Sequence, residues 1–350
     1  MEKPLSPGEF TRLANNFYNL QNVNVDYGRI SLDSYLLNYV AEHRQDVEKK
    51  SKVALCCICV NPTYWEYAKG MIEGARQYFL PGHNVDMLFW TDMPKIEDEA
   101  IFVDAEKHIL EAAKGVVGIE EHAKEAVKRA KEGVLVATQN ATIFPIEPIE
   151  WPYPTLMRYH TFLQQEEKLK EYDYVFYCDI DMVFAGIVGD EILSEELTAA
   201  QHPMYALDKM MWPPYEPNIE STAHIKRPGM IISDNGQPRF MPLYFAGGFQ
   251  GGKTEHWITA MKEMRKMIDK DALKNYIAIW NDESYWNKYL FENPPTKVLT
   301  PSYIYPDSLI NEYYKPRWGC DYPPKIITLT KKHTLKKIAP EDAEKLRMMK

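Results

Sequence analysis

Two aspartates separated by one residue, Asp179 and Asp181, directly follow the apolar run Tyr174–Cys178. If the backbone stays extended, residues two apart point to the same face, so both carboxylates are predicted to converge on one point. Carboxylate oxygens are hard ligands that suit Mg²⁺ or Mn²⁺, and these ions keep open positions for substrate phosphates. The pattern therefore indicates a divalent-metal site, with a turn that carries two solvated acids as the structural alternative.

Other chemistries have weaker support in the sequence. A strand followed by Asp-x-Asp also opens phosphohydrolases in which the first aspartate is the nucleophile and forms an aspartyl-phosphate. Those enzymes need a later lysine and an acidic pair, which cannot be placed convincingly in this chain. The cysteines Cys56, Cys57 and Cys59 lack a second Cys/His pair at zinc spacing, so they are predicted to be core residues.

The elements that position the aspartates alternate between strands and helices. Apolar runs predict strands at 53–60, 85–91, 135–144 and 172–178, a strand leading into 246–248, and a last strand at 325–329. Apolar residues at helical spacing predict helices at 64–79, 104–132, 155–171, 254–268 and 282–291. The opening strand–helix–strand unit predicts an α/β fold: a Rossmann-like nucleotide-binding domain with a mostly parallel sheet and its ligand at the carboxyl ends of the strands.

Composition excludes several classes of function. The 350 residues are 45% apolar and carry a formal charge of −9. An acidic chain is a poor nucleic-acid binder, because a phosphate backbone favours a basic surface. The longest apolar run, 53–60, is eight residues, whereas a membrane helix needs about 20. The N-terminus has no signal-peptide pattern, and five cysteines in 350 residues are typical of a reducing compartment. We therefore expect an intracellular enzyme without a transmembrane segment.

Several segments together resemble a known family. They are Tyr174–Phe184 (YVFYCDIDMVF) with Val188–Leu193 (VGDEIL), Phe245–Gly252 (FAGGFQGG), Trp280–Leu290 (WNDESYWNKYL) with Pro295–Pro301 (PTKVLTP), and more weakly Pro81-Gly82-His83 and Thr91-Asp92. In type and order they resemble the blood-group A/B transferase and α-1,3-galactosyltransferase family, glycosyltransferase family six. The resemblance spans about residues 53–337 and implies one GT-A catalytic domain over 53–340. An N-terminal arm over 1–52 and a helical insertion near 104–145 lie outside the family pattern, and a basic C-terminal tail covers 325–350.

The resemblance implies that the chain binds a UDP-sugar donor together with Mn²⁺, or Mg²⁺ in its place. Asp179 and Asp181 would hold the metal, and Arg158 would brace the aspartates and the donor. The other donor contacts that the resemblance implies are the backbone of Ile58, Cys59 and Val60 at the uracil, Tyr64 stacked on that base, Ala246, Gly247, Gly248 and Asp282 at the sugar, and Lys331 and Lys337 at the diphosphate.

Glu283 is the carboxylate that the resemblance places at the β-face of the donor sugar. A retaining outcome needs either a covalent glycosyl–enzyme intermediate or a same-face attack within an ion pair, and the sequence does not choose between them. Trp280 and Asn281 would contact the acceptor, and Asn281 stands where the family usually has a histidine. Pro306 stands where the family has an acidic acceptor contact, with Asp307 adjacent.

The expected activity is retaining transfer of GalNAc or Gal from UDP to a galactose-containing glycan. GalNAc is favoured because Gly248 would leave room for an N-acetyl group. Vertebrate members are Golgi membrane proteins, so the missing anchor implies a bacterial or phage enzyme in the cytoplasm. A metal-dependent phosphohydrolase and a catalytically silent UDP-sugar-binding protein remain the alternatives.

Overall fold

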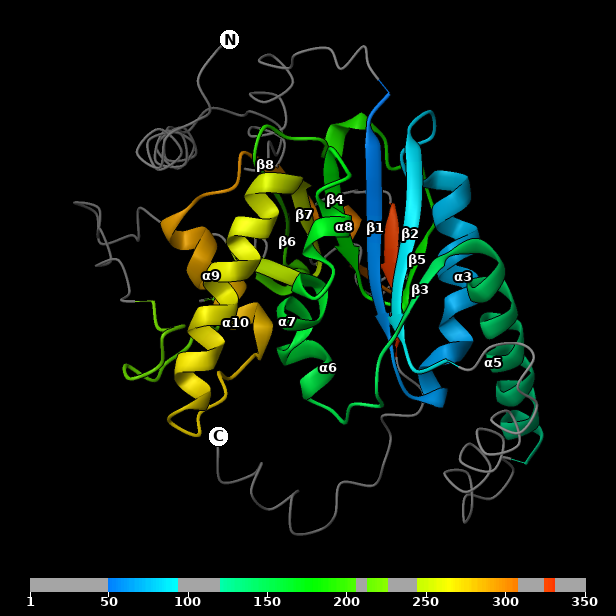
Figure 1. Ribbon diagram of the computed structural model, residues 1–350, viewed down its shortest axis with the longest axis horizontal. Coiled ribbons are helices and arrows are strands. Elements are labelled where there is room, and N and C mark those ends of the chain that lie inside the picture. The colour runs from blue at the N-terminus through cyan, green and yellow to red at the C-terminus, as the bar shows by residue number, and fades with distance from the viewer. Residues whose placement is uncertain (1–49, 94–119, 206–212, 226–243, 308–323, 331–350) are drawn as a thin grey trace, which may run out of the picture.

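A computed structural model of the chain describes residues 50–93, 120–205, 213–225, 244–307 and 324–330 (Figure 1). The predicted N-terminal arm, apart from residues 50–52, and the tail lysines Lys331 and Lys337 lie outside the described residues. None of the described helices is long and apolar enough to cross a membrane.

A seven-stranded sheet forms the centre of the fold, in the order β3-β2-β1-β4-β7-β6-β8. Its strands are β1 (Lys52–Cys59), β2 (Asn84–Thr91), β3 (Thr142–Pro145), β4 (Tyr174–Cys178), β6 (Leu197–Gln201), β7 (Phe245–Lys253) and β8 (Lys297–Leu299). Only β7 runs antiparallel to its neighbours, and every other pairing in this sheet is parallel. The mixed, mostly parallel α/β sheet predicted from the sequence is confirmed.

Helices cover both faces of this sheet (Figure 1). One face carries α3 (Pro62–Tyr78) and α5 (Glu120–Asn140), and the other carries α6 (Tyr153–Leu156), α7 (Arg158–Leu163), α8 (Glu166–Leu169), α9 (Thr254–Ala272) and α10 (Asp282–Glu292). Side chains of β1 alternate between the two cores: Val53, Leu55 and Cys57 pack with α3, whereas Ala54 and Cys56 join the core under α9. Burial on both faces explains why β1 is a continuous apolar run.

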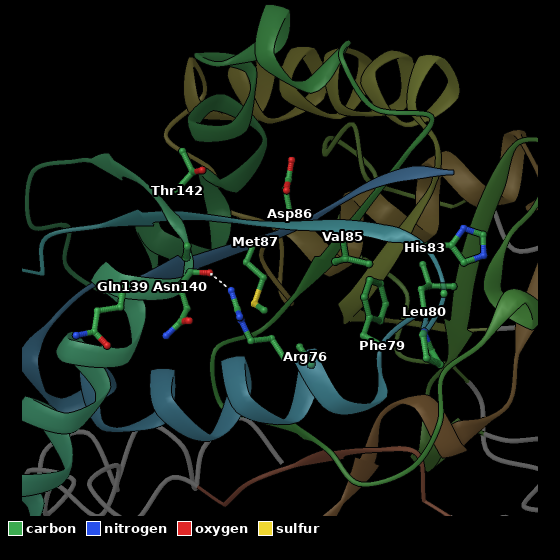
Figure 2. A pocket seen from close by; sticks show the side chains of 14 residues that line it. Arg76, Phe79, Leu80, His83, Val85, Asp86, Met87, Gln139, Asn140 and Thr142 are labelled. Atoms are coloured by element: carbon green, nitrogen blue, oxygen red, sulfur yellow. Dashed lines mark hydrogen bonds between the residues drawn. The ribbon is translucent and has the colours of Figure 1, made fainter. Parts of the chain in front are cut away.

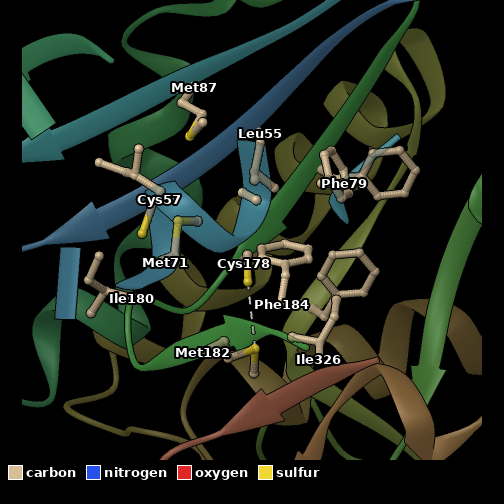
Figure 3. Packing of buried hydrophobic residues seen from close by; sticks show 14 of the residues in the cluster. Leu55, Cys57, Met71, Phe79, Met87, Cys178, Ile180, Met182, Phe184 and Ile326 are labelled. Atoms are coloured by element: carbon tan, nitrogen blue, oxygen red, sulfur yellow. Dashed lines mark hydrogen bonds between the residues drawn. The ribbon is translucent and has the colours of Figure 1, made fainter. Parts of the chain in front are cut away.

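A second, three-stranded sheet lies next to the aspartates, in the order β5 (Met182–Phe184), β10 (Ile326–Thr328), β9 (Tyr305–Pro306). Strand β5 begins directly after Asp181, and its residues Met182 and Phe184 are buried in the core below α3 (Figure 3). Ile326 of β10 belongs to the same cluster. The residues that follow the aspartates are therefore anchored by the core, and they pair with strand β10.

The prediction of a strand over residues 135–144 is wrong. It is helical to Asn140, and only Thr142–Pro145 form a strand. Val134 and Ala137 lie one turn apart and are buried in the core that α5 shares with α3, so the helical contact outweighs the β-branched composition. Within the predicted insertion, the described residues from 120 onward form a core helix and an edge strand.

The predicted helix 155–171 is also divided, into α6, α7 and α8. At the first break, Arg158 Nε donates to the Thr155 carbonyl, an oxygen that a continuous helix would give to a backbone N–H. The strand expected to lead into Ala246–Gly248 instead begins at Phe245 and continues through the glycines to Lys253.

A cavity of about 580 Å³ lies near the amino ends of the strands, whereas the aspartates follow the carboxyl end of β4. Figure 2 shows the side chains that line this cavity. It is lined by the end of α3, the end of α5 and the first residues of β2 and β3, among them Arg76, Asp86 and Thr142. Ligands of open α/β sheets bind at the carboxyl ends of the strands. This cavity, at the amino ends, is therefore not the predicted nucleotide site.

Two helix glycines test how α3 and α5 pack. A Cβ on Gly133 of α5 would lie 2.0 Å from the Trp65 carbonyl oxygen of α3, whereas a Cβ on Gly70 would make an ordinary 3.5 Å contact with Val183. Gly133→Ala should lower the free energy of unfolding by about 1–3 kcal/mol through overpacking. Gly70→Ala, the matched control, should raise it by up to about 1 kcal/mol because alanine is the better helix former. Urea denaturation measures both, and equal effects would contradict the close crossing.

Candidate active site

The site lies where β1 and β4 end and β7 begins. Because β7 runs antiparallel to β4, its first residues lie beside the last residues of β4, and the Asp179 N–H donates to the Gly248 carbonyl at 2.9 Å. Pairing between β1 and β4 stops at Cys56, so the last residues of β1 extend past β4 toward this edge. The structure thus brings Ile58–Val60, the aspartates and the glycines of β7 together at the carboxyl ends of β1 and β4.

Arg158 is the central group of the site. Its side chain is 3% exposed, and its Nη1 donates to the Gly247 carbonyl at 2.8 Å. Its Nε lies 3.1 Å from Asp282 Oδ2, and its Nη2 lies 3.5 Å from Asp179 Oδ1. One guanidinium therefore links the start of α7, the aspartate motif, β7 and the start of α10.

Tyr177 contacts both the Arg158 guanidinium and Asp179. Its ring lies 4.2 Å from the Arg158 Cζ, a cation–π contact, and its hydroxyl donates to Asp179 Oδ1. Burial opposes the charge of Arg158, but Asp282, Tyr177 and Asp179 raise its pKa above the ordinary value. The guanidinium is therefore a permanent positive charge in a dry environment.

The aspartate motif itself differs from the predicted geometry. Strand β4 ends at Cys178, and the chain turns immediately, with the Met182 N–H donating to the Asp179 carbonyl. The expectation that an extended backbone aligns the two carboxylates is wrong; a turn between β4 and β5 presents them instead. The Asp179 side chain is 32% exposed, whereas Asp181 is 3% exposed.

The donor set fits a metal that is shared with a substrate. Within the described ranges, no group of three Asp, Glu, His or Cys side chains could hold an ion. Mg²⁺ and ions like it are commonly bound by one or two carboxylates together with waters and substrate phosphates. Asp179 and Asp181 supply such a pair, so Mn²⁺ or Mg²⁺ at this motif stays a prediction that the residues can accommodate.

Glu283 lies in the first turn of α10, and its carboxylate is directed at β7. Its Oε2 accepts a hydrogen bond from the Gly247 N–H at 2.8 Å. Burial raises the pKa of Glu283 to about 7, although that hydrogen bond and the nearby Tyr244 hydroxyl lower it. The side chain of Asn287 fixes α10 against β7, because it donates to the Phe245 carbonyl and accepts from the Phe245 N–H, each at 2.8 Å. Nothing in the sequence marked Asn287 or Tyr244 individually.

Asp282, next to Glu283, is almost fully buried. Burial raises its pKa to about 8, and the charge of Arg158 acts in the opposite direction. In the described part of the site, four carboxylates (Asp179, Asp181, Asp282 and Glu283) stand against one guanidinium. Because the pKa values of Asp282 and Glu283 are about 8 and 7, the negative charge of these two groups develops only as the pH rises through that range.

Gly247 and Gly248 allow the close approach of these groups. A Cβ on Gly247 would lie 3.2 Å from Asp282 Oδ2, and a Cβ on Gly248 would lie 2.7 Å from Asp179 Oδ2 and 2.4 Å from the Met182 Cε. The space beside Gly248 is thus filled by the protein's own atoms. Gly248 is needed because Asp179 lies against it, and the preference for GalNAc stays a prediction.

The residues predicted at the acceptor lie on the solvent side of Glu283. Trp280 is 46% exposed, and Asn281 adopts the left-handed φ of 49° just before α10. On the other side, His202, Tyr205 and Tyr215 form an aromatic cluster around Tyr244, with centroid separations of 5.3–5.7 Å to its ring. Burial lowers the pKa of His202 to about 4, so this imidazole is neutral. The aromatic cluster was missed from the sequence because its members come from separate segments.

The predicted uracil contacts lie at the end of β1 and the start of α3. Ile58, Cys59 and Val60 are buried, and Tyr64 is partly buried in the first turn of α3. The bend between them is held by Asp92, whose carboxylate accepts from the Asn61 N–H at 2.9 and 3.1 Å and from the Trp65 indole at 3.0 Å.

The described chain ends beside the aspartate motif. The Leu329 N–H donates to the Asp181 carbonyl at 2.8 Å, and the Thr330 N–H donates to Asp307 Oδ2 at 2.8 Å. Asp307 follows Pro306, the position at which the family has an acidic acceptor contact. In the structure its carboxylate accepts hydrogen bonds from Thr330, at the start of the C-terminal tail. Lys331 follows directly but lies outside the described residues, as does Lys337.

Removal of the central guanidinium should be costly. Arg158→Met leaves Asp179 and Asp282 without their buried partner and should lower the free energy of unfolding by about 3–5 kcal/mol at pH 8. Carboxyls whose pKa is raised by folding stabilise the folded state below about pH 4, and this contribution is lost as the pH rises through 7–8. The loss should therefore be smaller at pH 5.5, where these groups are protonated.

The matched control is Arg129→Met, which breaks a partly exposed 3.2 Å pair with Glu66, in which the Arg129 side chain is 45% exposed. It should cost less than about 1 kcal/mol at either pH. Denaturant unfolding at pH 5.5 and 8 measures both variants. Equal losses at the two sites would show that Arg158 is not the central charge.

Comparison with known proteins now identifies the family. A model of glycosyltransferase family 6 matches residues 104–314, which includes the segment expected to lie outside the family pattern. Histo-blood group ABO system transferase 1 of Rattus norvegicus is 28% identical over 249 residues, 71% of this chain and 59% of that protein. Globoside alpha-1,3-N-acetylgalactosaminyltransferase 1 of Homo sapiens is 26% identical over 246 residues, 70% of this chain and 58% of that protein.

A bacterial relative is also similar. The O-antigen biosynthesis glycosyltransferase WbnI of Escherichia coli is 28% identical over 169 residues, 48% of this chain and 67% of that protein. The chain spans about three fifths of the length of the two animal relatives. The family match covers more than half of the chain, the sheet is GT-A-like, and the motif segments that contain Asp179, Gly247 and Glu283 meet at one site. The chain belongs to glycosyltransferase family 6.

Proposed function

We propose that this protein is a retaining glycosyltransferase that moves GalNAc or Gal from a UDP-sugar to a galactose-containing glycan, with Mn²⁺ as cofactor. One observation carries the proposal. Arg158 pairs with Asp179 of the aspartate motif and with Asp282 beside Glu283, so the predicted diphosphate side and the predicted sugar side are joined by a single buried charge. The human relative, a globoside alpha-1,3-N-acetylgalactosaminyltransferase, supports GalNAc as the sugar and an α-1,3 linkage.

The electrostatics agree with a diphosphate leaving group. A divalent ion held by Asp179 and Asp181 would stabilise the negative charge that develops on UDP as the bond to the sugar breaks. The Leu329–Asp181 hydrogen bond brings the start of the basic tail to the same place. Lys331 and Lys337 are therefore proposed to supply further positive charge at the diphosphate.

Glu283 is proposed to act at the anomeric carbon. Its Oε2 is oriented by the Gly247 N–H, and its neighbour Asp282 is proposed to bind a donor-sugar hydroxyl while it stays paired with Arg158. A carboxylate at this position can attack the anomeric carbon as a nucleophile or stabilise positive charge during same-face attack. Trp280 and Asn281 are proposed to contact the acceptor, since an exposed indole offers an apolar face to a sugar ring.

Turnover of UDP-sugars tests the function directly. UDP release from UDP-GalNAc and UDP-Gal should require Mn²⁺ and stop with EDTA, and galactose-terminated oligosaccharides should accelerate it. Asp181→Asn and Glu283→Gln should each lower kcat by at least about 100-fold, because one weakens the metal site and the other removes the charge at the reacting carbon. Slow hydrolysis of donor without acceptor is expected, since water can enter an empty acceptor site.

The same assay separates the alternatives. Release of inorganic phosphate without UDP would indicate a phosphohydrolase, and UDP-sugar binding without turnover by any acceptor would indicate a silent binding protein. Metal-independent turnover, or full activity of Asp181→Asn, would refute the mechanism. A cytoplasmic location in a bacterium or an infected host stays a prediction.

Gly248→Ala tests the contact between β7 and the aspartate motif. A Cβ at this position would displace the Asp179 carboxylate or the Met182 side chain. We expect the affinity for UDP in the presence of Mn²⁺ to fall about tenfold, with both donor sugars affected equally because the substitution acts on Asp179. Isothermal titration with UDP measures this. A selective loss of UDP-GalNAc alone would instead support the original expectation that Gly248 makes room for the N-acetyl group.

A further inference from the structure

Two buried carboxylates outside the family motifs hold one loop in place. Residues 213–225 contain no helix or strand, yet Glu216 within this loop is 2% exposed. Asp271, near the end of α9, is fully buried and faces the same loop. A buried carboxylate is costly unless it is hydrogen-bonded. The hydrogen-bond partners of Glu216 and Asp271 therefore show which segments these two carboxylates connect.

Glu216 is saturated with donors from two segments. Its Oε1 accepts from the Tyr276 hydroxyl at 2.6 Å and from the Asn218 N–H at 2.8 Å. Its Oε2 accepts from the Ile279 N–H at 2.7 Å. The carboxylate thus bridges its own loop and the connection between α9 and α10. Burial and the Glu216 charge raise the pKa of Tyr276 to about 12, so the tyrosine acts as a donor at neutral pH.

Asp271 fixes the loop that carries Glu216. Its carboxylate accepts from the Ser221 hydroxyl at 2.6 Å, from the Thr222 N–H at 2.9 Å and from the Tyr285 hydroxyl at 3.0 Å. Lys274 adds a bond to the Glu220 carbonyl at 2.7 Å. The loop is therefore pinned to α9 and α10, and Glu216 is held at a defined distance from the chain that leads to Trp280.

This arrangement acts on one half of the candidate site. Ile279 directly precedes Trp280, the residue proposed to face the acceptor. By contrast, the main contacts of the proposed donor half come from other elements: Arg158 holds Asp282, and the Gly247 N–H holds Glu283. The loop approaches this half through Tyr215, whose ring packs on Tyr244. A displaced residue 279 would therefore move Trp280 while the groups proposed at the donor keep their partners.

We propose that Glu216 is a positioning residue for acceptor binding, which acts by holding the backbone at Ile279 and thereby Trp280. The inference rests on the proposed function, because it needs an acceptor at Trp280. It assigns a role in the reaction to a side chain that touches neither the proposed donor nor the reacting atoms. Its signature is a separation of acceptor transfer from donor binding and donor hydrolysis.

The test compares Glu216→Gln with Tyr276→Phe. The glutamine amide group presents one nitrogen that cannot accept, so the backbone N–H groups and the tyrosine hydroxyl can no longer all be satisfied. The tyrosine variant removes one donor and leaves the Ile279 bond intact. We expect Glu216→Gln to lower kcat/KM for a galactose-terminated oligosaccharide at least tenfold, mainly through KM. Its affinity for UDP with Mn²⁺ and its acceptor-free hydrolysis of UDP-sugar should stay within about twofold of wild type.

Tyr276→Phe should keep the acceptor KM within about threefold of wild type. Glu216→Asp, which retains the charge but has a shorter reach, should show the same separation and serves where the glutamine variant does not fold. An unchanged ratio of transfer to hydrolysis in the folded Glu216 variants, or a parallel loss of UDP affinity, would overturn the inference alone. Lack of UDP-sugar turnover by the wild-type protein would overturn the proposed function as well.

Discussion

The buried charge of Arg158 is the constraint around which the site is organised. A guanidinium that is 3% exposed needs partners within the protein, and it finds them on four segments. It donates hydrogen bonds to the carbonyls of Thr155 and Gly247, and it forms ion pairs with the carboxylates of Asp179 and Asp282. These segments meet at one point because each contributes to solvating the same charge. The break between α6 and α7 follows from it, since the arginine takes the Thr155 carbonyl that a continuous helix would use.

The same arrangement leaves the site short of positive charge. The described part of the site has one guanidinium, and burial raises the pKa values of Asp282 and Glu283 to about 8 and 7, so neither carboxyl is fully ionised at neutral pH. A chain of formal charge −9 would repel a diphosphate unless cations are gathered locally. A metal at Asp179 and Asp181 and the tail that begins beside Asp181 would meet that need at the point where it arises.

Sequence reasoning succeeded where a local pattern has one physical cause: the continuous apolar run of β1 could be predicted because a central parallel strand is buried on both faces. Arg158, Asp282 and Glu283 were singled out by the family resemblance, and the structure places Arg158 beside Asp179 and Asp282. It failed where tertiary contacts decide. Residues 135–140 are helical because they pack on α3, the aspartates lie on a turn, and the space beside Gly248 is filled by Met182. None of these neighbours can be read from sequence spacing.

The acceptor half shows most clearly why the remainder could not be predicted. Its geometry depends on hydrogen bonds between distant parts of the chain. The Ile279 N–H, for example, donates to Glu216, and these two residues are 63 positions apart in the sequence. Neither residue belongs to a recognisable pattern, and a lone glutamate in a proline-containing loop has many possible surface roles. The donor half is instead assembled by adjacent strands and one arginine. The two proposed halves are connected through residues 280–282 and through the contact of Tyr215 with Tyr244. A change at Glu216, which holds the backbone of Ile279, is therefore expected to alter acceptor binding more than the charges at the proposed donor side.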